Sequence, residues 1–243
     1  ARTAPQGLAD AFRLEWHAAA GARAATWKAE GRLRGLGVQA EPAADPQALG
    51  RPGVAGADVV FQATPAGGRA DVALNGGHLE FPGVFEAPRL TFDRLAAGIR
   101  WTVDGDRIDV EIARLQVANA DVEADIRLRW HTADPATSPA QSRFPGVLDL
   151  EARLLRADGA RVYRYLPQDI PATVRRYLQT AIREGRATDG RFRVRGDLWH
   201  FPFDAPGTGA FEVTARLHDV LFDYAPAYLL PPASLGWPGL RVE

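Results

Sequence analysis

The feature that most constrains the fold of this 243-residue chain is a strict alternation of apolar and charged residues. The clearest run covers residues 121–130, where every even position is apolar and every odd position is charged. Successive side chains of a strand point to opposite faces, so this run predicts a β-strand with one apolar and one charged face. The pattern recurs at residues 191–198 and 211–218, and over shorter stretches at 12–16, 27–33, 72–75, 99–103 and 148–154.

Turn residues separate these predicted strands. Asp104-Gly105 predicts a tight hairpin, and Asn75-Gly76-Gly77 predicts another. Between Ile112 and Leu115 the alternation slips by one residue, which predicts a bulge or bend. We expect about ten strands, joined mostly by short turns and therefore antiparallel.

One amphipathic helix is predicted near residues 171–184. Pro171 suits its first position, and Gly185 suits its C-terminal cap. Apolar residues between them form one stripe, at positions 174, 177, 178, 181 and 182. A shorter helical turn is expected at 159–165, ended by Pro167.

Two segments rich in small residues and proline, 41–56 and 132–142, predict long surface loops or boundaries between stacked β units. An aromatic-Pro-Gly-aliphatic motif recurs with unequal spacing, which fits a β array whose units vary in length; it occupies residues 81–84, 144–147 and 237–240. We therefore expect residues 1–243 to be one continuous segment of a repeating β structure, with sub-units at 1–55, 56–143 and 144–243.

Charge and composition exclude several classes. The formal net charge is −1, from 29 basic and 30 acidic residues, which argues against a simple electrostatic nucleic-acid binder. No stretch approaches the roughly 18 apolar residues of a membrane span. The chain has no cysteine and no methionine, and we expect it to be a piece of a longer protein.

A search for catalytic or metal-binding patterns finds none. The five histidines do not form a His-Glu-x-x-His pattern, and the three serines lack a Gly-x-Ser-x-Gly elbow. Asp104, Asp106 and Asp109 lack the spacing of a calcium loop and are interpreted as solvated carboxylates of a hairpin. The prediction is therefore that the chain is not an enzyme and holds no metal or cofactor.

The apolar faces of the predicted strands are then the candidate site. One helix of about a dozen residues cannot cover some ten strands, so the face must meet a second sheet, close into a barrel or bind a ligand. An apolar concave surface would mark a ligand or interaction groove, although sandwich packing satisfies the same pattern. The candidate lining residues, for each of which plain core packing is the alternative, are Trp101, Val122, Ile126, Leu128, Phe192, Val194, Phe211 and Val213.

Four segments of the sequence also occur in a recognisable order. They are Phe85, Pro88, Leu90, Leu95 and Trp101; Asn119-Ala120-Asp121; Tyr163-Arg164-Tyr165-Leu166-Pro167 with the helix that follows; and Gly196-Asp197-Leu198-Trp199-His200-Phe201-Pro202-Phe203. In this order they resemble landmarks of the AsmA-like YhdP family. The resemblance covers about residues 53–240, and the first fifty residues more loosely.

The resemblance implies a fold and a function. Proteins of this family are Gram-negative envelope proteins, with an N-terminal inner-membrane anchor and a long periplasmic β-groove implicated in moving phospholipids toward the outer membrane. It implies that this chain is mostly β: a long twisted antiparallel sheet curled into an open groove. The chain would lie in the periplasm, with its parent protein anchored outside these residues. Its expected partners are phospholipid acyl chains and other envelope proteins, without nucleic acid, catalysis or cofactor.

An alternative of a different class remains. The chain could be a non-catalytic structural or regulatory envelope module that binds another protein, for example by strand addition at an open sheet edge. A lipid groove predicts sensitivity to charge on the inward-facing residues of the strands. A protein-binding module predicts sensitivity at edge strands and loops.

Overall fold

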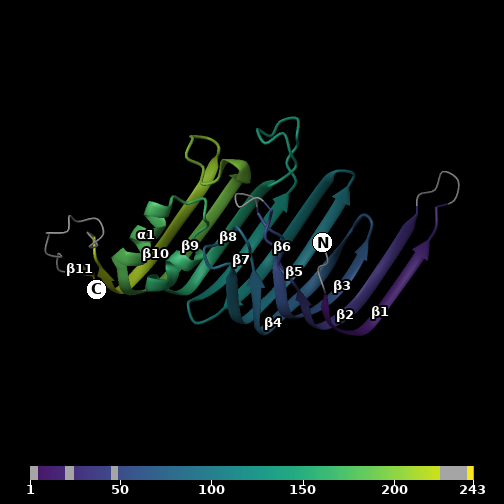
Figure 1. Cartoon of the computed structure of the whole chain (residues 1–243), viewed down its shortest axis with the longest axis horizontal. Coiled ribbons are helices and arrows are strands. Elements are labelled where there is room, and N and C mark those ends of the chain that lie inside the picture. Colours follow the sequence, from purple (N-terminus) through teal and green to yellow (C-terminus); the bar gives the residue numbers. More distant parts are fainter. Residues whose placement is uncertain (1–4, 20–24, 45–48, 225–239, 243) are drawn as a thin grey trace.

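The computed structural model describes residues 5–19, 25–44, 49–224 and 240–242. Within these ranges, eleven strands form a single sheet in which each strand lies beside its sequence neighbours. Every adjacent pair is antiparallel. Figure 1 shows the strands side by side, from β1 at one end to β11 at the other.

The strands are long because the alternating pattern extends beyond its clearest runs. They are β1 (Gln6–His17), β2 (Thr26–Val38), β3 (Gly53–Thr64), β4 (Gly67–Glu80), β5 (Arg89–Asp104), β6 (Arg107–Ala118), β7 (Val122–His131), β8 (Val147–Asp158), β9 (Ile182–Asp197), β10 (Gly209–Phe222) and β11 (Leu240–Val242). The helical elements are η1 (Gly159–Tyr165), α1 (Ala172–Ala181) and η2 (Leu198–His200).

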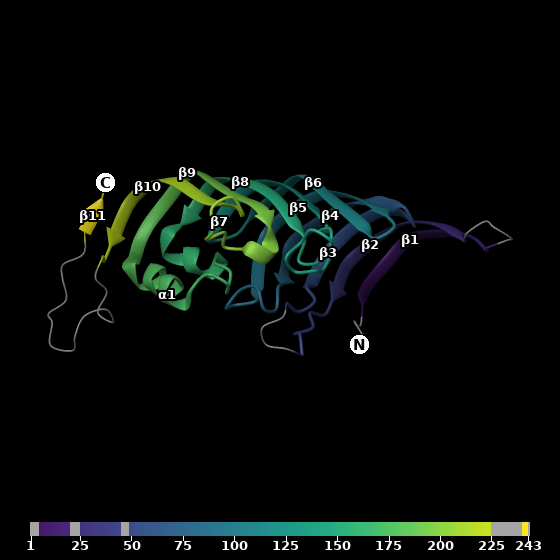
Figure 2. The same ribbon diagram turned by 90° about the horizontal axis from the view of Figure 1, so that it is seen from above.

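The sheet is curled but not closed. β1 and β11 lie at opposite ends of the strand order and do not pair with each other. Seen from above, the sheet arches and α1 lies on its concave side (Figure 2). We call the concave face the inner face and the opposite one the outer face. The predicted fold, a mostly-β antiparallel sheet curled into an open groove with one amphipathic helix, is confirmed.

Several local predictions are also confirmed. β5 and β6 are joined by a tight turn in which Gly105 has a φ of 55°, a backbone conformation that glycine adopts without strain. Between Ile112 and Leu115 the register shifts against both neighbouring strands, as a bulge requires. The helical turn expected at 159–165 is η1.

The hairpin predicted at Asn75-Gly76-Gly77 is wrong, because these residues lie inside β4. Gly76 has a φ of 74° and Gly56 of the neighbouring strand β3 a φ of 83°. The β3–β4 register shifts here, while pairing with β5 continues on the other side. The glycines thus make an irregularity within a continuing strand, and the chain reverses at residues 65–66 instead.

The predicted ends of the helix need correction. α1 begins at Ala172 with Pro171 as its N-cap, and it ends at Ala181. Ile182 already belongs to β9, where it pairs with Phe222 of β10. Gly185 is therefore not a helix cap: it lies in β9, where a side chain would meet Val220. The helix therefore ends at Ala181, one residue before the last apolar residue of the predicted stripe, because Ile182 pairs with β10.

The buried core lies on the inner face, toward one end of the strands. Its most buried large side chain is Leu74, which is 0% exposed. Phe81 and Phe85 of the β4–β5 connection and Tyr165 of η1 pack against this core. The core cluster itself comprises Ala57, Leu74, Leu90, Phe92, Leu95, Val117 and Ala124. The sheet therefore buries this end of its inner face under connecting segments, without a second sheet among the described residues.

The two predicted loop segments differ in extent. The first is shorter than expected, because Glu41 and Arg51 form an isolated bridge and β3 begins at Gly53. The second forms the connection between β7 and β8. The third aromatic-Pro-Gly motif, at 237–239, lies outside the described residues. At the first predicted boundary, β3 pairs with β2 on both sides of residues 55–56, and near the second, β7 pairs with β8. The division of the chain into sub-units stays a prediction.

Candidate functional site

Cross-strand pairing aligns the apolar side chains of the inner face into rows that run along the sheet. The central row takes one residue from each strand between β2 and β10: Leu33, Val59, Val72, Ala97, Leu115, Ile126, Ala152, Phe192 and Val213. Every member is apolar. At the usual spacing between neighbouring strands, the row is about 38 Å long.

Two further rows flank the central row on the side toward η2. The nearer one is Gly31, Phe61, Ala70, Ile99, Ile112, Leu128, Leu150, Val194 and Phe211; the next is Ala29, Ala63, Gly68, Trp101, Val110, Trp130, Leu148, Gly196 and Gly209. These rows hold apolar side chains and glycines and no charge. We call the three rows together the apolar band.

The structure brings the predicted lining residues together on the inner face. Seven of them lie in the apolar band, and Val122 lies beyond it, packed against the core cluster. Val194 is only 5% exposed, whereas Val213 is 54% exposed. The predicted lining residues thus range from buried core positions to exposed surface positions. Their contact with a ligand stays a prediction.

The outer face has the opposite character. The row behind the apolar band reads Glu30, Gln62, Arg69, Arg100, Glu111, Arg129, Asp149 and Arg195. Several members form exposed ion pairs, such as Arg129 with Glu111 at 3.1 Å. A sheet with charges on one face and an uninterrupted apolar band on the other presents only the inner face to an apolar ligand.

One rim of the inner face is made by two segments that are distant in the sequence. The backbone N–H of Gln168 donates to the carbonyl of Val84 at 2.8 Å, and its Nε2 donates to the carbonyl of Phe85 at 2.9 Å. Arg175 of α1 forms an ion pair with Glu86 at 2.7 Å. The β4–β5 connection and the segment leading into α1 therefore form one continuous brace.

The opposite rim carries aromatic side chains from the β7–β8 and β9–β10 connections. Phe144 stacks on Trp130, with ring centroids 6.1 Å apart. Phe201 packs edge-to-face on Phe211, at 5.4 Å, and Phe211 contacts Phe192 in the same way at 5.5 Å. Phe144 and Phe201 thus border the apolar band on this side and contact rings that belong to it. The role of Phe144 in this rim could not be predicted from the sequence, because only the folded connection brings it back onto Trp130.

A hydrogen-bonded cluster joins η1 to the turn between β6 and β7, and we call it the Asn119 latch. Asn119 Nδ2 donates to the carbonyl of Thr91 at 2.8 Å and to Tyr165 Oη at 3.0 Å. Asn119 Oδ1 accepts from the backbone N–H groups of Asp121 and Val122, at 2.9 and 2.8 Å. Tyr165 Oη donates to Asp121 at 3.2 Å.

Arg164 completes the latch by forming an ion pair with the same carboxylate of Asp121. The latch joins two landmarks of the family resemblance, Asn119–Asp121 and the tyrosine segment of η1. Sequence reasoning gave these residues no physical role. Their proximity depends on the path of the chain between β8 and β9.

The latch predicts a loss of stability at alkaline pH. Burial, together with the negative charge of Asp121, raises the pKa of Tyr165. Its neutral phenol therefore stabilises the fold fully below the ordinary tyrosine pKa of about 10, and this contribution is lost as pH rises through the raised pKa. Tyr165→Phe should lower the free energy of unfolding by about 1–2 kcal/mol near neutrality and flatten its alkaline decline.

Urea unfolding between about pH 8 and about pH 11 measures both effects. Tyr163→Phe, which changes a tyrosine of η1 outside the latch, is the control and should leave the alkaline decline in place. A decline of equal slope in Tyr165→Phe and the wild type would show that the latch does not depend on a neutral Tyr165.

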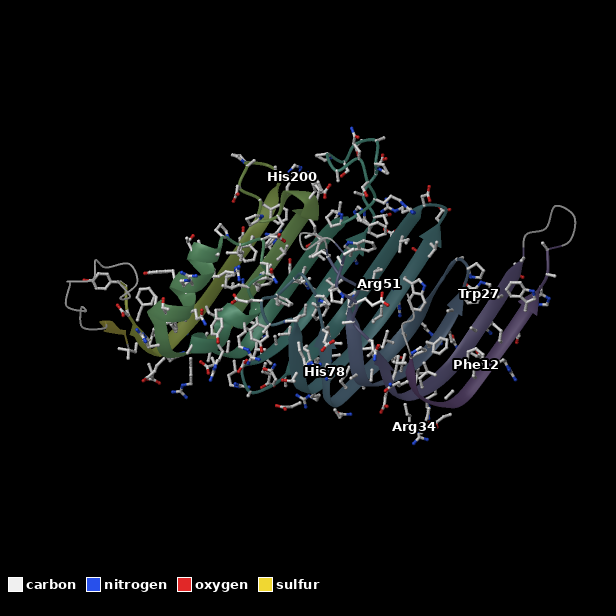
Figure 3. All side chains as sticks on the ribbon, viewed as in Figure 1. Phe12, Trp27, Arg34, Arg51, His78 and His200 are labelled. Atoms are coloured by element: carbon white, nitrogen blue, oxygen red, sulfur yellow. The ribbon has the colours of Figure 1, made fainter. Side chains whose placement is uncertain are left out.

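The described residues also lack the cluster of ligands that a metal site requires. Within them, no set of three or more His, Asp or Glu side chains could hold a metal ion. Figure 3 shows His78 and His200 at opposite ends of the strands. The helices in the described ranges are all too short or too polar to cross a membrane.

The fold and site define a class: an open, groove-forming antiparallel β protein whose apolar band runs between two rims. A comparison with protein families identifies it further. The family model described as "YhdP protein" matches residues 1–241, so the chain belongs to the YhdP family. This confirms the resemblance drawn from the sequence. Comparisons with curated proteins and with solved structures gave no match.

Proposed function

We propose that this chain is a periplasmic segment of an inner-membrane-anchored envelope protein that conducts phospholipids along its apolar band. The observation that carries the proposal is the continuity of the central row, which crosses nine strands without a polar residue. Membership of the YhdP family supports it. The acyl chains would be the principal partner, with other envelope proteins as further ones.

The mechanism follows from the uniformity of the band. Each acyl methylene removed from water gains about 0.8 kcal/mol, wherever along the band it lies. One leaflet of a bilayer is about 15 Å deep, so the band is longer than a single acyl chain. A lipid tail can then slide along the exposed part of the band from one apolar position to the next, with little change in free energy.

The open side of the groove accommodates the headgroup. Burying an unpaired charge against the apolar band would cost several kcal/mol, so the headgroup stays in water while the tails lie on the inner face. Conduction in this form forms and breaks no covalent bond. The proposed function therefore needs no catalytic residue and no cofactor.

Site-specific photocrosslinking in cells tests the proposal. The probe is placed in turn at Ile126 and Leu128 on the inner face, and at Arg127 and Arg129 on the outer face of the same strand. We expect phospholipid adducts, read by mass spectrometry of the full-length protein, at the two inner positions only. The outer positions are the matched control, because they lie on the same strand. Arg129 is the stricter control of the two, since Arg127 lines an arginine-rich hollow of the outer face.

Two results would contradict lipid conduction. Absence of lipid adducts at all four positions would remove the groove as a lipid path. Protein adducts at Arg127 or Arg129, without lipid at Ile126 and Leu128, would favour the alternative of a protein-binding envelope module.

A further inference from the structure

The outer face contains a group of arginines that lie close together across three strands. Arg153 of β8 and Arg191 of β9 are direct cross-strand partners. Arg193 lies two residues further along β9, and Arg216 lies on β10. All four line one hollow of about 1320 Å³. Like charges directly opposite each other destabilise a sheet, so this arrangement needs an explanation.

We call Arg153, Arg191, Arg193 and Arg216 the arginine cluster. The strand register places Asp125 opposite Arg153, and Glu151 and Glu212 on either side of Arg193, but among the described residues these carboxylates form no ion pair with the cluster. In the described part of the chain, none of the four forms an ion pair or a side-chain hydrogen bond. Nε of Arg193 is buried without a partner. By contrast, Arg195 and Arg129 on the same face pair with carboxylates.

Carboxylates do lie near the cluster, but two of them are already engaged. Asp125 accepts from Gln116 Nε2 at 3.0 Å, and Glu151 accepts from Arg127 Nε at 3.1 Å. Asp189 and Glu212 also line the hollow. The lining as a whole contains six arginines and four carboxylates, so it is net positive although the chain carries −1.

The pKa of Glu151 reflects the positive charge of the arginines around it. Its hydrogen bond with Arg127 holds its pKa below the usual range, and the charges of Arg193 and Arg191 lower it further. The arginines therefore act together at this position, even where they do not touch the carboxylate.

We propose that the arginine cluster is a binding site for a phosphate group, on the face opposite the apolar band. A guanidinium presents paired N–H donors that match phosphate oxygens, and a phosphate can accept from several guanidiniums at once. Bound phosphate would remove the repulsion between Arg153 and Arg191. The hollow is larger than a typical small-molecule pocket, so the phosphate can belong to a larger molecule, either a soluble one or a lipid headgroup.

The test compares two double variants that remove the same charge from the same face. Arg153→Gln with Arg191→Gln removes the cross-strand pair of the cluster. Arg129→Gln with Arg195→Gln removes two arginines that already have carboxylate partners. Calorimetric titration with inorganic pyrophosphate, and sedimentation with phosphatidylglycerol vesicles against phosphatidylcholine vesicles, measure the soluble and the lipid source of phosphate.

We expect the cluster variant to bind about tenfold more weakly than the wild type, and the control variant to stay within about twofold. Loss confined to the pyrophosphate titration assigns a soluble phosphate, and loss confined to the phosphatidylglycerol vesicles assigns a headgroup. If the wild type binds neither probe, or if both variants lose binding equally, the site does not exist.

Thermal unfolding provides a second readout with a distinctive sign. Without added anion, the cluster variant should unfold at a higher temperature than the wild type, because it lacks the like-charge pair. Pyrophosphate should raise the unfolding temperature of the wild type and the control, but not that of the cluster variant. A cluster variant that unfolds at a lower temperature and is still stabilised by pyrophosphate would overturn the proposal.

Discussion

Replacing Ala97 by Asp should abolish phospholipid transfer in cells, whereas replacing the adjacent Ala96 by Asp should leave it near the wild-type level. The two alanines are neighbours on β5 and are both half-buried. Ala97 lies in the central row between Val72 and Leu115. Ala96 lies on the outer face. The pair isolates the face as the only variable.

The expected difference follows from desolvation. A carboxylate in the apolar band must lose water when a lipid tail passes, which costs several kcal/mol against about 0.8 kcal/mol gained per methylene. On the outer face the new carboxylate stays hydrated, because no lipid tail covers it. A single charge should therefore interrupt conduction from the inner face alone.

Loss of folding must be separated from loss of conduction. Val213→Asp provides the second inner variant, because Val213 is exposed and its substitution buries no charge in the fold. Transfer should fail in this variant although its thermal unfolding matches that of the wild type. Equal transfer by Ala97→Asp and Ala96→Asp, or normal transfer by Val213→Asp, would contradict a lipid path along the band.

Replacing Asn119 by Ala should lower the free energy of unfolding by about 3 kcal/mol. Asn119 is 8% exposed, and its side chain makes hydrogen bonds to Thr91, Asp121, Val122 and Tyr165. The substitution leaves two backbone N–H groups and one carbonyl without their partner. Each buried group left in this state costs about 1–3 kcal/mol, partly recovered by water.

Urea unfolding measures this difference, with an unchanged slope as the sign of a preserved unfolded state. Gln116→Ala is the control, because Gln116 lies in β6, just before the turn that holds Asn119, and makes one side-chain hydrogen bond, to Asp125. It should cost about 0.5–1.5 kcal/mol. If Asn119→Ala cost no more than Gln116→Ala, the latch would be a minor contact.

The sequence predicted those parts of the fold that depend on local periodicity. Alternation identified the inner and outer faces of β7, β9 and β10, and the slip between Ile112 and Leu115 identified a bulge. The prediction failed where a glycine can form either a turn or an irregularity within a strand. Gly76 served a strand irregularity instead of a turn, because β5 continues to pair beside it.

The candidate site divides in the same way. Its lining residues follow from parity within single strands, so the sequence places them on one face. The latch and the rims depend on contacts between distant segments, such as Asn119 with Tyr165 or Arg175 with Glu86. No spacing within one element predicts such pairs. The end of α1 likewise depends on the partner that β10 offers to Ile182.

The strictly sequential order of strands has a consequence for how such a protein can change in length. Each strand hydrogen-bonds only to the strands before and after it, as the repeats of a repeat protein contact only their neighbours. Outside the stretch from β4 to β9, which the brace and the Asn119 latch tie together, inserting or deleting one whole hairpin would leave the other strand pairings and the orientation of both faces intact. It would change the length of the band by about 10 Å. The length of the apolar band is thus set by the number of strands, and evolution can change it one hairpin at a time.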